Sequence, residues 1–219
     1  MWPFTRKPKA LDPALLQGWT DWHSHLLPGV DDGIRTMEDA LAVLQWYEAS
    51  GVQEVWLTPH IMVDCPNTTA ELRARFAALR GAWTGSVRLH LAAEHMLDAL
   101  FEERLRTGDV LPLGEAGDHL LVETSCYNPP MNLSALFSRI RALGFYPVLA
   151  HPERYFYMEK EDYRRLHEEG VVFQLNLPSL AGYYGPLPAR KAAMLQKAGW
   201  YSFTGSDLHS LPAFRSVFR

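Results

Sequence analysis

The sequence predicts an α/β fold built as a small barrel of seven strand and helix units. Two observations support this prediction: short apolar runs alternate with helical segments, and His, Asp or Glu residues follow the ends of most apolar runs. The alternation indicates parallel strands joined by helical crossovers. In a barrel the carboxyl ends of all strands meet on one face, whereas an open doubly wound sheet would spread them along an edge. Polar residues at successive strand ends therefore favour the barrel.

The expected strands are short apolar runs, and each expected helix stops at a glycine. The strands cover residues 19–22, 52–58, 87–93, 119–123, 146–150, 171–175 and 200–204. The helices cover residues 36–50, 68–80, 97–107, 133–143, 160–169 and 188–198. A glycine suits the left-handed conformation of a helix C-cap. Thr68 and Glu71 form a capping-box sequence at the start of the second helix.

Length and composition fit one domain that follows a short tail. The chain has 219 residues, of which 47% are apolar and 12% aromatic, enough for a sizeable core. We expect an N-terminal tail over residues 1–18 and a single domain over residues 19–219. Residues 2–9 are aromatic and basic, which would suit a weak membrane or partner contact, but their two prolines favour an unstructured tail.

Charge and apolar runs argue against several kinds of partner. Lys and Arg number 21 against 25 Asp and Glu, a formal charge of −4 that does not indicate nucleic acid binding. No run approaches the roughly 18 apolar residues of a membrane span, and the first residues lack the apolar core of a signal peptide. Cys65 and Cys126 cannot build a disulfide framework. We therefore expect a cytoplasmic protein without stable membrane insertion.

The first strand end carries a candidate pair of metal ligands. His23 and His25 are two residues apart, so their side chains project from the same side of an extended chain. The turn that follows, Pro-Gly-Val-Asp-Asp-Gly at residues 28–33, contains Asp32. Its carboxylate suits metal ligation, turn formation or both.

Later strand ends add further candidate ligands. They are His60, Glu94, Glu123, His151, Asp207 and His209. Each has a structural explanation when taken alone, such as a salt bridge or a hydrogen-bonded core histidine. Taken together they indicate metal binding, because carboxylates directly after apolar runs would be costly to bury unpaired. We leave out His90, His95, His119 and His167, since His95 would point away from Glu94 and His167 lies among charged residues of a helix.

The donor types suggest the chemistry. A set of His, Asp and Glu without cysteine favours manganese, iron, zinc or magnesium. The set exceeds what one tetrahedral site needs, so at least two ions are implied, which suits in-line attack on a phosphoryl group by a metal-activated hydroxide. Arg154 offers a planar fork for two phosphate oxygens, the alternative being a surface pair with Glu153 or Glu161. Cysteine chemistry is disfavoured, because Cys126 has no glycine-rich phosphate loop after it.

These motifs together resemble the polymerase-and-histidinol-phosphatase (PHP) family. They are Asp-x-His-x-His-Leu-Leu-Pro-Gly-x-Asp-Asp-Gly at residues 21–33, Thr-Pro-His at 58–60, Glu94, Glu123, Ala-His-Pro-Glu-Arg-Tyr at 150–155 and Gly-Ser-Asp-x-His at 205–209. The similarity runs from Trp19 to His209. Within the family, His-Pro-Glu-Arg-Tyr is similar to the bacterial manganese-dependent protein-tyrosine phosphatases of capsule and exopolysaccharide operons.

The resemblance implies a distorted (β/α)7 TIM-like barrel, the PHP fold, with three Mn²⁺ ions. By motif, the first ion would be held by His23, His25, Glu94 and Asp207, the second by Glu94, Glu123 and His151, and the third by Asp32, His60 and His209. The resemblance also implies that Glu94, Arg154 and His209 form the catalytic set. Arg154, with Arg215 as a second arginine, would bind the phosphate while a metal-bridging hydroxide attacks phosphorus.

The implied substrate is phosphotyrosine on a protein. In the family it lies in the tyrosine-rich tail of a membrane-bound kinase of polysaccharide export, which would place a cytoplasmic enzyme at the inner face of the membrane. Three alternatives compete with this interpretation: a PHP phosphatase of a small phosphomonoester such as histidinol phosphate, a PHP nuclease, and a non-catalytic regulator that binds phosphotyrosine. The lack of a basic stripe argues against the nuclease, and the complete ligand set argues against the regulator.

Overall fold

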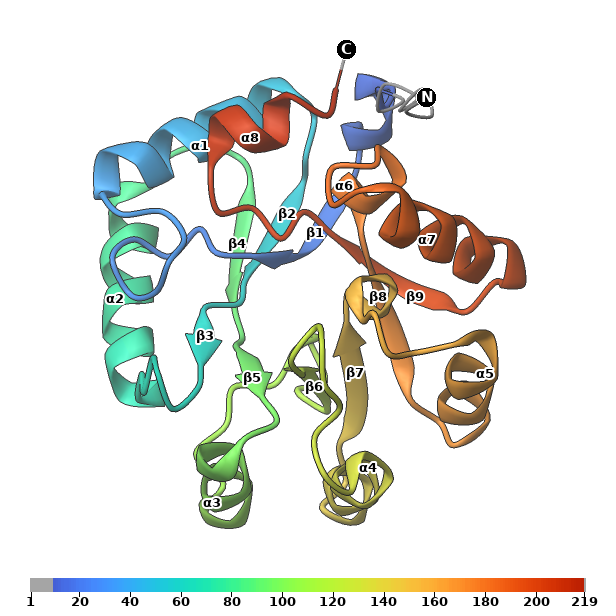
Figure 1. The fold of residues 1–219 in the computed structure, drawn as a ribbon. Helices are drawn as coiled ribbons and strands as arrows, with labels where there is room; N and C mark the ends of the chain where they lie inside the picture. Colours follow the sequence, from blue (N-terminus) through green and yellow to red (C-terminus); the bar gives the residue numbers. More distant parts are fainter. Residues whose placement is uncertain (1–9, 219) are drawn as a thin grey trace.

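Parallel strands occupy the centre of the fold and helices surround them (Figure 1). The structure, a computed structural model, describes residues 10–218. The strands are β1 (Thr20–Ser24), β2 (Glu54–Leu57), β3 (His60–Ile61), β4 (Arg88–Leu91), β5 (Glu94–Met96), β6 (His119–Glu123), β7 (Tyr146–Ala150), β8 (Val172–Asn176) and β9 (Tyr201–Gly205). They form one sheet of order β1-β2-β4 and another of order β3-β5-β6-β7-β8-β9. Within each sheet, all neighbouring strands pair in parallel.

The seven predicted strands are all present, and two of them, at residues 52–58 and 87–93, are followed by short strands that were not predicted, β3 and β5. Pro59, which has no backbone N–H, separates β2 from β3, and a two-residue step separates β4 from β5. Hydrogen bonds cross these breaks, because Ala92 N donates to Leu57 O (2.9 Å) and Glu94 N donates to Pro59 O (3.1 Å). Each such pair therefore behaves as one kinked strand that runs from one sheet into the other.

The last strand returns to the first. Asp207 N donates to His23 O (2.8 Å), His25 N donates to Leu208 O (3.1 Å), and Ser24 pairs with Leu208 in a parallel bridge. These bonds join the end of β9 to the end of β1. The α/β class with parallel strands is confirmed, while closure into a regular barrel stays a prediction, since the strands pair as two sheets linked here by a single bridge.

All six predicted helices form, with shifted ends. The helices are α1 (Met37–Ala49), α2 (Thr69–Ala82), α3 (Ala99–Thr107), α4 (Leu133–Ala142), α5 (Lys160–Glu168), α6 (Leu177–Leu180), α7 (Pro186–Ala198) and α8 (Leu211–Arg215), with 3-10 turns η1 (Pro13–Leu16) and η2 (Pro152–Arg154). The prediction did not include the short α6 and α8. The capping box is confirmed, since Glu71 N donates to Thr68 Oγ1 and Thr68 N donates to Glu71 Oε2. The predicted stop at Gly81 is wrong, because α2 continues through it and Trp83 N still donates to Leu79 O.

Part of the predicted tail packs on the domain. Residues 10–18 include η1, whose Leu16 is buried, and Leu11 N donates to Val217 O (2.7 Å) near the other end of the chain. Pro13 suits the first turn of η1, and Asp12 caps it through Ala14 N. The predicted unstructured segment at residues 2–9 lies outside the described residues.

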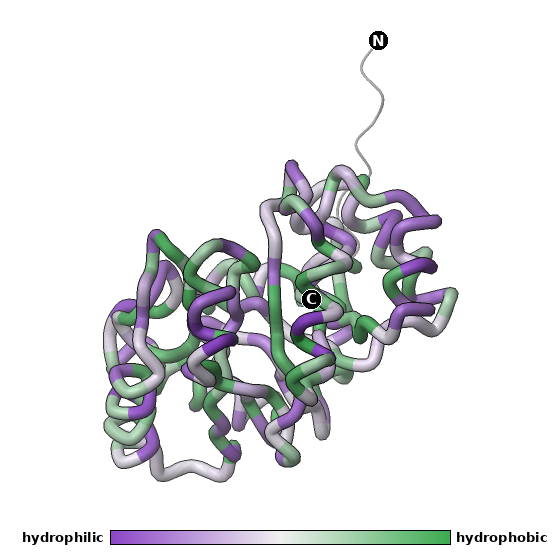
Figure 2. The backbone as a smooth tube through the Cα atoms, turned by 90° about the horizontal axis from the view of Figure 1, so that it is seen from below, coloured by the Kyte–Doolittle hydropathy of each residue, from purple (hydrophilic) through white to green (hydrophobic). Residues whose placement is uncertain are grey.

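Two large hydrophobic clusters support the strands from outside. One packs α1 and α2 on the first strands, with Tyr47 and Leu57 at its centre, and the other packs α3 to α5 on β6 to β8, with Phe137 and Phe173. In Figure 2 the helices alternate hydrophilic and hydrophobic residues, as expected for elements that bury one face. Among residues 10–218, no helix combines the length and apolar character needed to cross a membrane.

Candidate metal centre

The structure brings all nine predicted ligands together, although His60 and Glu94 are the first residues of β3 and β5 rather than residues at a strand end. His23 lies in β1, His60 in β3, Glu94 in β5 and Glu123 at the end of β6. His25 and Asp32 follow β1, His151 follows β7, and Asp207 and His209 follow β9. Residues from both sheets therefore meet on one face, as the strand-end argument predicts.

Irregular backbone aims several of these side chains. In β1, Asp21 is paired with Val55 and Ser24 with Leu57, so the strand contains one extra residue between Asp21 and Ser24, next to His23. His151 and Asp207 have positive φ values of 34° and 51°, which non-glycine residues rarely adopt. Such backbone strain clusters at functional sites, where the surrounding structure stabilises it.

Four donor atoms form the first group, and they come from the residues that the resemblance implied for the first ion. Nε2 of His23 and Nε2 of His25 are 3.1 Å apart. Oε2 of Glu94 lies 3.2 and 3.3 Å from these nitrogens, and Oδ1 of Asp207 lies 3.7 and 3.5 Å from them. All four residues are buried.

Glu94 also belongs to the second group. Its Oε1 lies 3.0 Å from His151 Nε2, and Glu123 Oε2 lies 3.7 Å from the same nitrogen. His60 enters this group as well, with its Nδ1 3.2 Å from Glu94 Oε2 and 3.2 Å from Glu123 Oε1. The resemblance implied His60 only for the third ion, so its position between two groups is a difference from that expectation.

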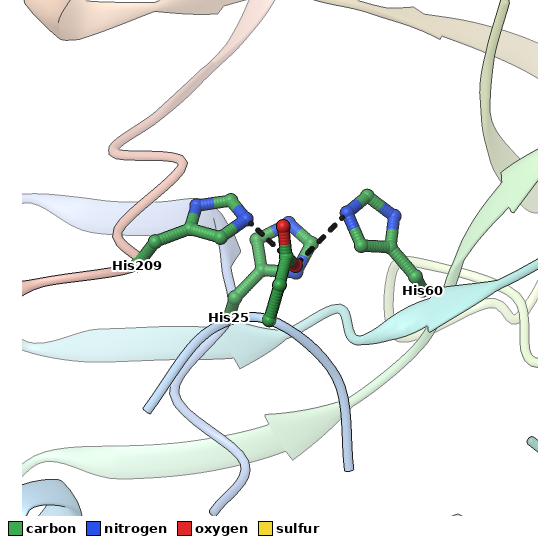
Figure 3. A group of neighbouring side chains, drawn as sticks. His25, His60 and His209 are labelled. Atoms are coloured by element: carbon green, nitrogen blue, oxygen red, sulfur yellow. Dashed lines mark ion pairs between the residues drawn. The ribbon is translucent and has the colours of Figure 1, made fainter. Parts of the chain in front are cut away.

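The third group lies at the solvent side. Asp32 Oδ1 is 3.3 Å from His209 Nε2 and 3.6 Å from His60 Nε2. The rings of His25 and His209 are stacked with centroids 4.0 Å apart, and Figure 3 shows His25, His60 and His209 gathered around these ion pairs. Asp32 is 73% exposed in its side chain. The first group is therefore buried, whereas the third group is accessible to solvent.

The donor atoms fit divalent cations. Within the described part of the chain, His60 Nδ1, Glu94 Oε2 and Glu123 Oε1 are buried atoms without a hydrogen-bond partner. His60 Nδ1 lies 3.2 Å from each of the two carboxylate oxygens. A buried polar atom left without a partner is costly, and a cation between one imidazole and two carboxylates would satisfy all three at once.

The electrostatics of the centre favour positive charge. Burial lowers the pKa of His23, but the carboxylates of Glu94 and Asp207 outweigh burial and raise that pKa to about 9. Burial raises the pKa of Glu94, yet the charge of His23 and the hydrogen bond from His151 hold it well below its usual value. The buried carboxylate of Glu94 thus stays ionised and attracts cations to the centre.

Arg154 lies beside this centre. Its Nη1 is 2.5 Å from Asp207 Oδ2, and its guanidinium carbon is 4.5 Å from the centroid of the Tyr184 ring. Both residues line a cavity of about 250 Å³ that also reaches His209 and Phe214. Glu153 is not its partner, because that carboxylate is buried and accepts from Asn176 N (3.0 Å) and Tyr201 OH (2.8 Å).

The structure does not bring Arg215 to the centre. Phe214 is buried against Trp19, and this turns the next residue of α8 outward. The Arg215 guanidinium lies 5.9 Å from the centroid of the Trp46 ring and lines a separate groove with Leu211, Pro212 and Ser216. Arg215 thus does not line the cavity of Arg154 in this structure. Sequence spacing alone does not tell which side of a short helix a residue occupies.

Three residues that the sequence analysis did not assign contact the candidate ligands. Asp31 accepts from His25 Nδ1 (2.8 Å), Gln174 Oε1 lies 2.9 Å from His23 Nδ1, and Asn176 Nδ2 donates to Asp207 Oδ2 (2.8 Å). The sequence contains a signal for Gln174, because it is the one polar residue within the apolar run of residues 171–175, where a buried amide needs a partner. Neither Asp31 nor Asn176 differs from ordinary turn and strand-end residues in a single sequence.

The position of His95 agrees with its exclusion from the candidate ligands. His95 is buried next to Glu94 but faces away from the centre, with its Nδ1 3.2 Å from Leu121 O and its ring against Phe101. Burial lowers the pKa of His95 to about 4. It is a neutral core histidine, as the alternation along a strand predicts.

Known proteins are similar to this chain over most of its length. A family model described as capsular polysaccharide synthesis, CpsB/CapC, matches residues 19–215. The chain is 27% identical over 204 residues to the tyrosine-protein phosphatase CpsB of Streptococcus pneumoniae, which covers 87% of this chain and 83% of the relative. It is 26% identical over 197 residues to the tyrosine-protein phosphatase YwqE of Bacillus subtilis, covering 87% of this chain and 77% of the relative.

A further relative and a solved structure are also similar to this chain. The putative tyrosine-protein phosphatase CapC of Staphylococcus aureus is 23% identical over 197 residues, covering 87% of this chain and 77% of the relative. A solved structure described under YwqE and CpsB as unique metal-dependent tyrosine phosphatases matches with a TM-score of 0.82 and 25% identity. The match covers 90% of this chain and 81% of the solved one.

Proposed function

Because this chain belongs to the CpsB/CapC family of capsular polysaccharide synthesis, we propose that it is a metal-dependent phosphatase that hydrolyses phosphotyrosine on a protein. The observation that carries the proposal is the convergence of five histidines and four carboxylates on one face, with Arg154 at its edge. The relatives named as tyrosine-protein phosphatases support the substrate class.

The proposal includes three Mn²⁺ ions. The nine converging residues would hold them, with Glu94 shared between two ions and His60 facing two of the groups. A donor set of imidazoles and carboxylates without thiolate suits Mn²⁺, with Fe, Zn or Mg as alternatives. When bound, such ions supply Lewis acidity at the phosphoryl group and a water of lowered pKa.

Arg154 has the phosphate-binding role in this proposal. Its guanidinium has five N–H donors, and the contact with Asp207 Oδ2 engages Nη1, so donors remain for phosphate oxygens. Stacking on Tyr184 and pairing with Asp207 hold the planar group in one orientation. An oriented guanidinium stabilises charge that develops on the phosphoryl oxygens.

The walls of the cavity support an aromatic substrate. Tyr183, Tyr184 and Phe214 line it next to Arg154, while Asp207 and His209 form the side toward the metal centre. His209 Nδ1 donates to Asp207 O (2.9 Å), which leaves its Nε2 toward Asp32 and places His209 between cavity and centre. A tyrosyl ring would find apolar contacts in this cavity, whereas a small polar phosphomonoester would not use them.

The protein substrate in this proposal is a phosphorylated bacterial tyrosine kinase of polysaccharide export. The family description, capsular polysaccharide synthesis, supports this choice of partner. The encounter takes place in the cytoplasm at the inner face of the membrane.

The test compares three substrates with the purified protein and Mn²⁺: a phosphotyrosyl peptide, the matched phosphoseryl peptide and histidinol phosphate. We expect the highest kcat/KM for the phosphotyrosyl peptide and loss of turnover on chelation. A clear preference for histidinol phosphate would refute the tyrosine-phosphatase assignment. Binding of the phosphotyrosyl peptide without any turnover in Mn²⁺ would instead support a non-catalytic regulator.

A further inference from the structure

We propose that Asp31 and Gln174 are positioning residues, each of which uses one oxygen atom to hold two candidate metal-ligating histidines that lie on different elements. The proposal rests on the metal-binding part of the proposed function. It extends that function by assigning which nitrogen of His23 and of His25 faces the metal.

Asp31 holds His25 and His60. Its Oδ2 lies 2.8 Å from His25 Nδ1 and 3.1 Å from the backbone N of His60, and its Oδ1 accepts from Gly33 N (3.0 Å). The side chain is 1% exposed. Both oxygens are thus engaged by protein donors, which separates Asp31 from its exposed neighbour Asp32, the candidate ligand.

Gln174 repeats this arrangement on the other side of the centre. Its Oε1 lies 2.9 Å from His23 Nδ1 and 3.2 Å from the backbone N of His151, and its Nε2 donates to Leu175 O (2.5 Å). A backbone N–H only donates, so the atom facing His151 is the amide oxygen. His23 Nδ1 must therefore carry the hydrogen of that bond.

The two oxygens determine the tautomers of the two rings. With the hydrogen on Nδ1, each ring presents the lone pair of Nε2, and these two nitrogens lie 3.1 Å apart facing Glu94 and Asp207. A partner at the second nitrogen orients a metal-bound histidine, and its loss typically lowers metal affinity 10- to 100-fold. Asp31 also carries charge, which Gln174 lacks, so the two residues separate the effect of charge from that of orientation.

The test measures Mn²⁺ binding to the metal-free protein, from the free Mn²⁺ signal in electron paramagnetic resonance. For Asp31→Asn, Asp31→Ala and Gln174→Met we expect the wild-type number of ions with roughly 10- to 100-fold weaker affinity, Asp31→Ala being weaker than Asp31→Asn. Asp32→Asn, in contrast, should bind fewer ions. Asp12→Asn and Gln196→Met make the same chemical changes at exposed positions and should bind like the wild type.

Each other outcome has a distinct meaning. Wild-type protein that binds no Mn²⁺ would contradict the metal-binding function itself. Wild-type affinity in Asp31→Ala and Gln174→Met would overturn the positioning inference alone, and an ion lost in Asp31→Asn would make Asp31 a ligand instead. The unfolding temperature of each metal-free variant is measured to separate a folding defect from weaker binding.

A second measurement needs no variant. In wild-type protein loaded with diamagnetic Zn²⁺ and labelled with ¹⁵N-histidine, proton-coupled nitrogen spectra report which ring nitrogen carries hydrogen. We expect hydrogen on Nδ1 of both His23 and His25. A proton on Nε2 of either ring would overturn the inference for that ring, whether or not the variants fold.

Discussion

Arg154 and Asp207 form an ion pair that joins the phosphate side of the site to the metal side. Nη1 of Arg154 lies 2.5 Å from Oδ2 of Asp207, while Oδ1 of the same carboxylate lies 3.5 Å from His25 Nε2. Burial raises the pKa of Asp207, but His23 and Arg154 outweigh burial and lower it, so the carboxylate stays ionised. The buried Asp207 side chain thus faces both the candidate phosphate-binding arginine and the candidate metal ligands.

Replacing Arg154 should weaken catalysis through the phosphate. We expect Arg154→Ala to lower kcat/KM for a phosphotyrosyl peptide about 100-fold, or about 2.7 kcal/mol, because oriented donors to the phosphoryl oxygens are lost. Arg154→Lys keeps the charge but not the planar fork, so it should recover only part of this. Steady-state kinetics check both values, with the Mn²⁺ content of each variant measured alongside. An unchanged kcat/KM in Arg154→Ala would remove Arg154 from the site.

Replacing Arg215 should have little effect on turnover. Its guanidinium lies over Trp46 in a groove separate from that of Arg154, so Arg215→Ala should keep kcat/KM within about twofold, as expected for a surface residue without contact to the site. The same kinetic assay compares it directly with Arg154→Ala. A loss comparable to that of Arg154→Ala would show that α8 moves to bring Arg215 to the phosphate.

Glu94 should be needed for both metal binding and activity. Its two oxygens lie between His23, His25, His60 and His151, so Glu94→Gln keeps the shape and removes the shared charge. We expect at least about a 100-fold loss of turnover, comparable to removal of one strong electrostatic contact in an active site. Metal analysis should also find less Mn²⁺ per chain. Glu115→Gln, at an exposed position, is the matched control.

Chelation should act on the wild-type protein in the same way. Removal of divalent ions should abolish turnover of an aryl phosphate, and added Mn²⁺ should restore it. In the proposed reaction the ions, rather than a protein side chain, would supply the nucleophilic water. Activity that survives chelation, and that also survives in Glu94→Gln, would refute metal-dependent hydrolysis.

A buried hydrogen bond under the metal centre should contribute to stability. Tyr47 OH donates to Asp21 Oδ2 (2.5 Å), and Asp21 Oδ1 accepts from Ser206 N (2.7 Å), next to Asp207. Tyr47→Phe leaves the buried carboxylate with fewer donors, and we expect a loss of roughly 1–3 kcal/mol in the free energy of unfolding. Urea unfolding of the metal-free protein measures this. Tyr146→Phe, at an exposed position, should change it by less than about 0.5 kcal/mol.

Secondary structure was largely predictable because it depends on local signals. Apolar runs, caps and turn residues are contiguous in the chain, so strands such as β6 and β7 and the capping box of α2 appear where expected. The break at Pro59 and the passage of α2 through Gly81 were not predicted. Both features are compatible with local signals that the prediction did not weigh, because Pro59 has no backbone N–H for a strand ladder and a glycine costs a helix only about 1 kcal/mol.

The alternation of apolar runs and polar residues predicted that the nine candidate ligands share one face, because parallel strands bring their carboxyl ends together however far apart the ligands lie in the sequence. Distances among side chains could not be inferred in this way, since they depend on the bulge in β1 and on the positive φ of His151 and Asp207. The structure also shows that His60 lies between two groups, that Asp31 and Asp32 differ in exposure, and that Arg154 faces Asp207 while Arg215 lies over Trp46. A repeating pattern of residues suffices to predict which side chains share a face, whereas the partner of each atom depends on the packed backbone that carries it.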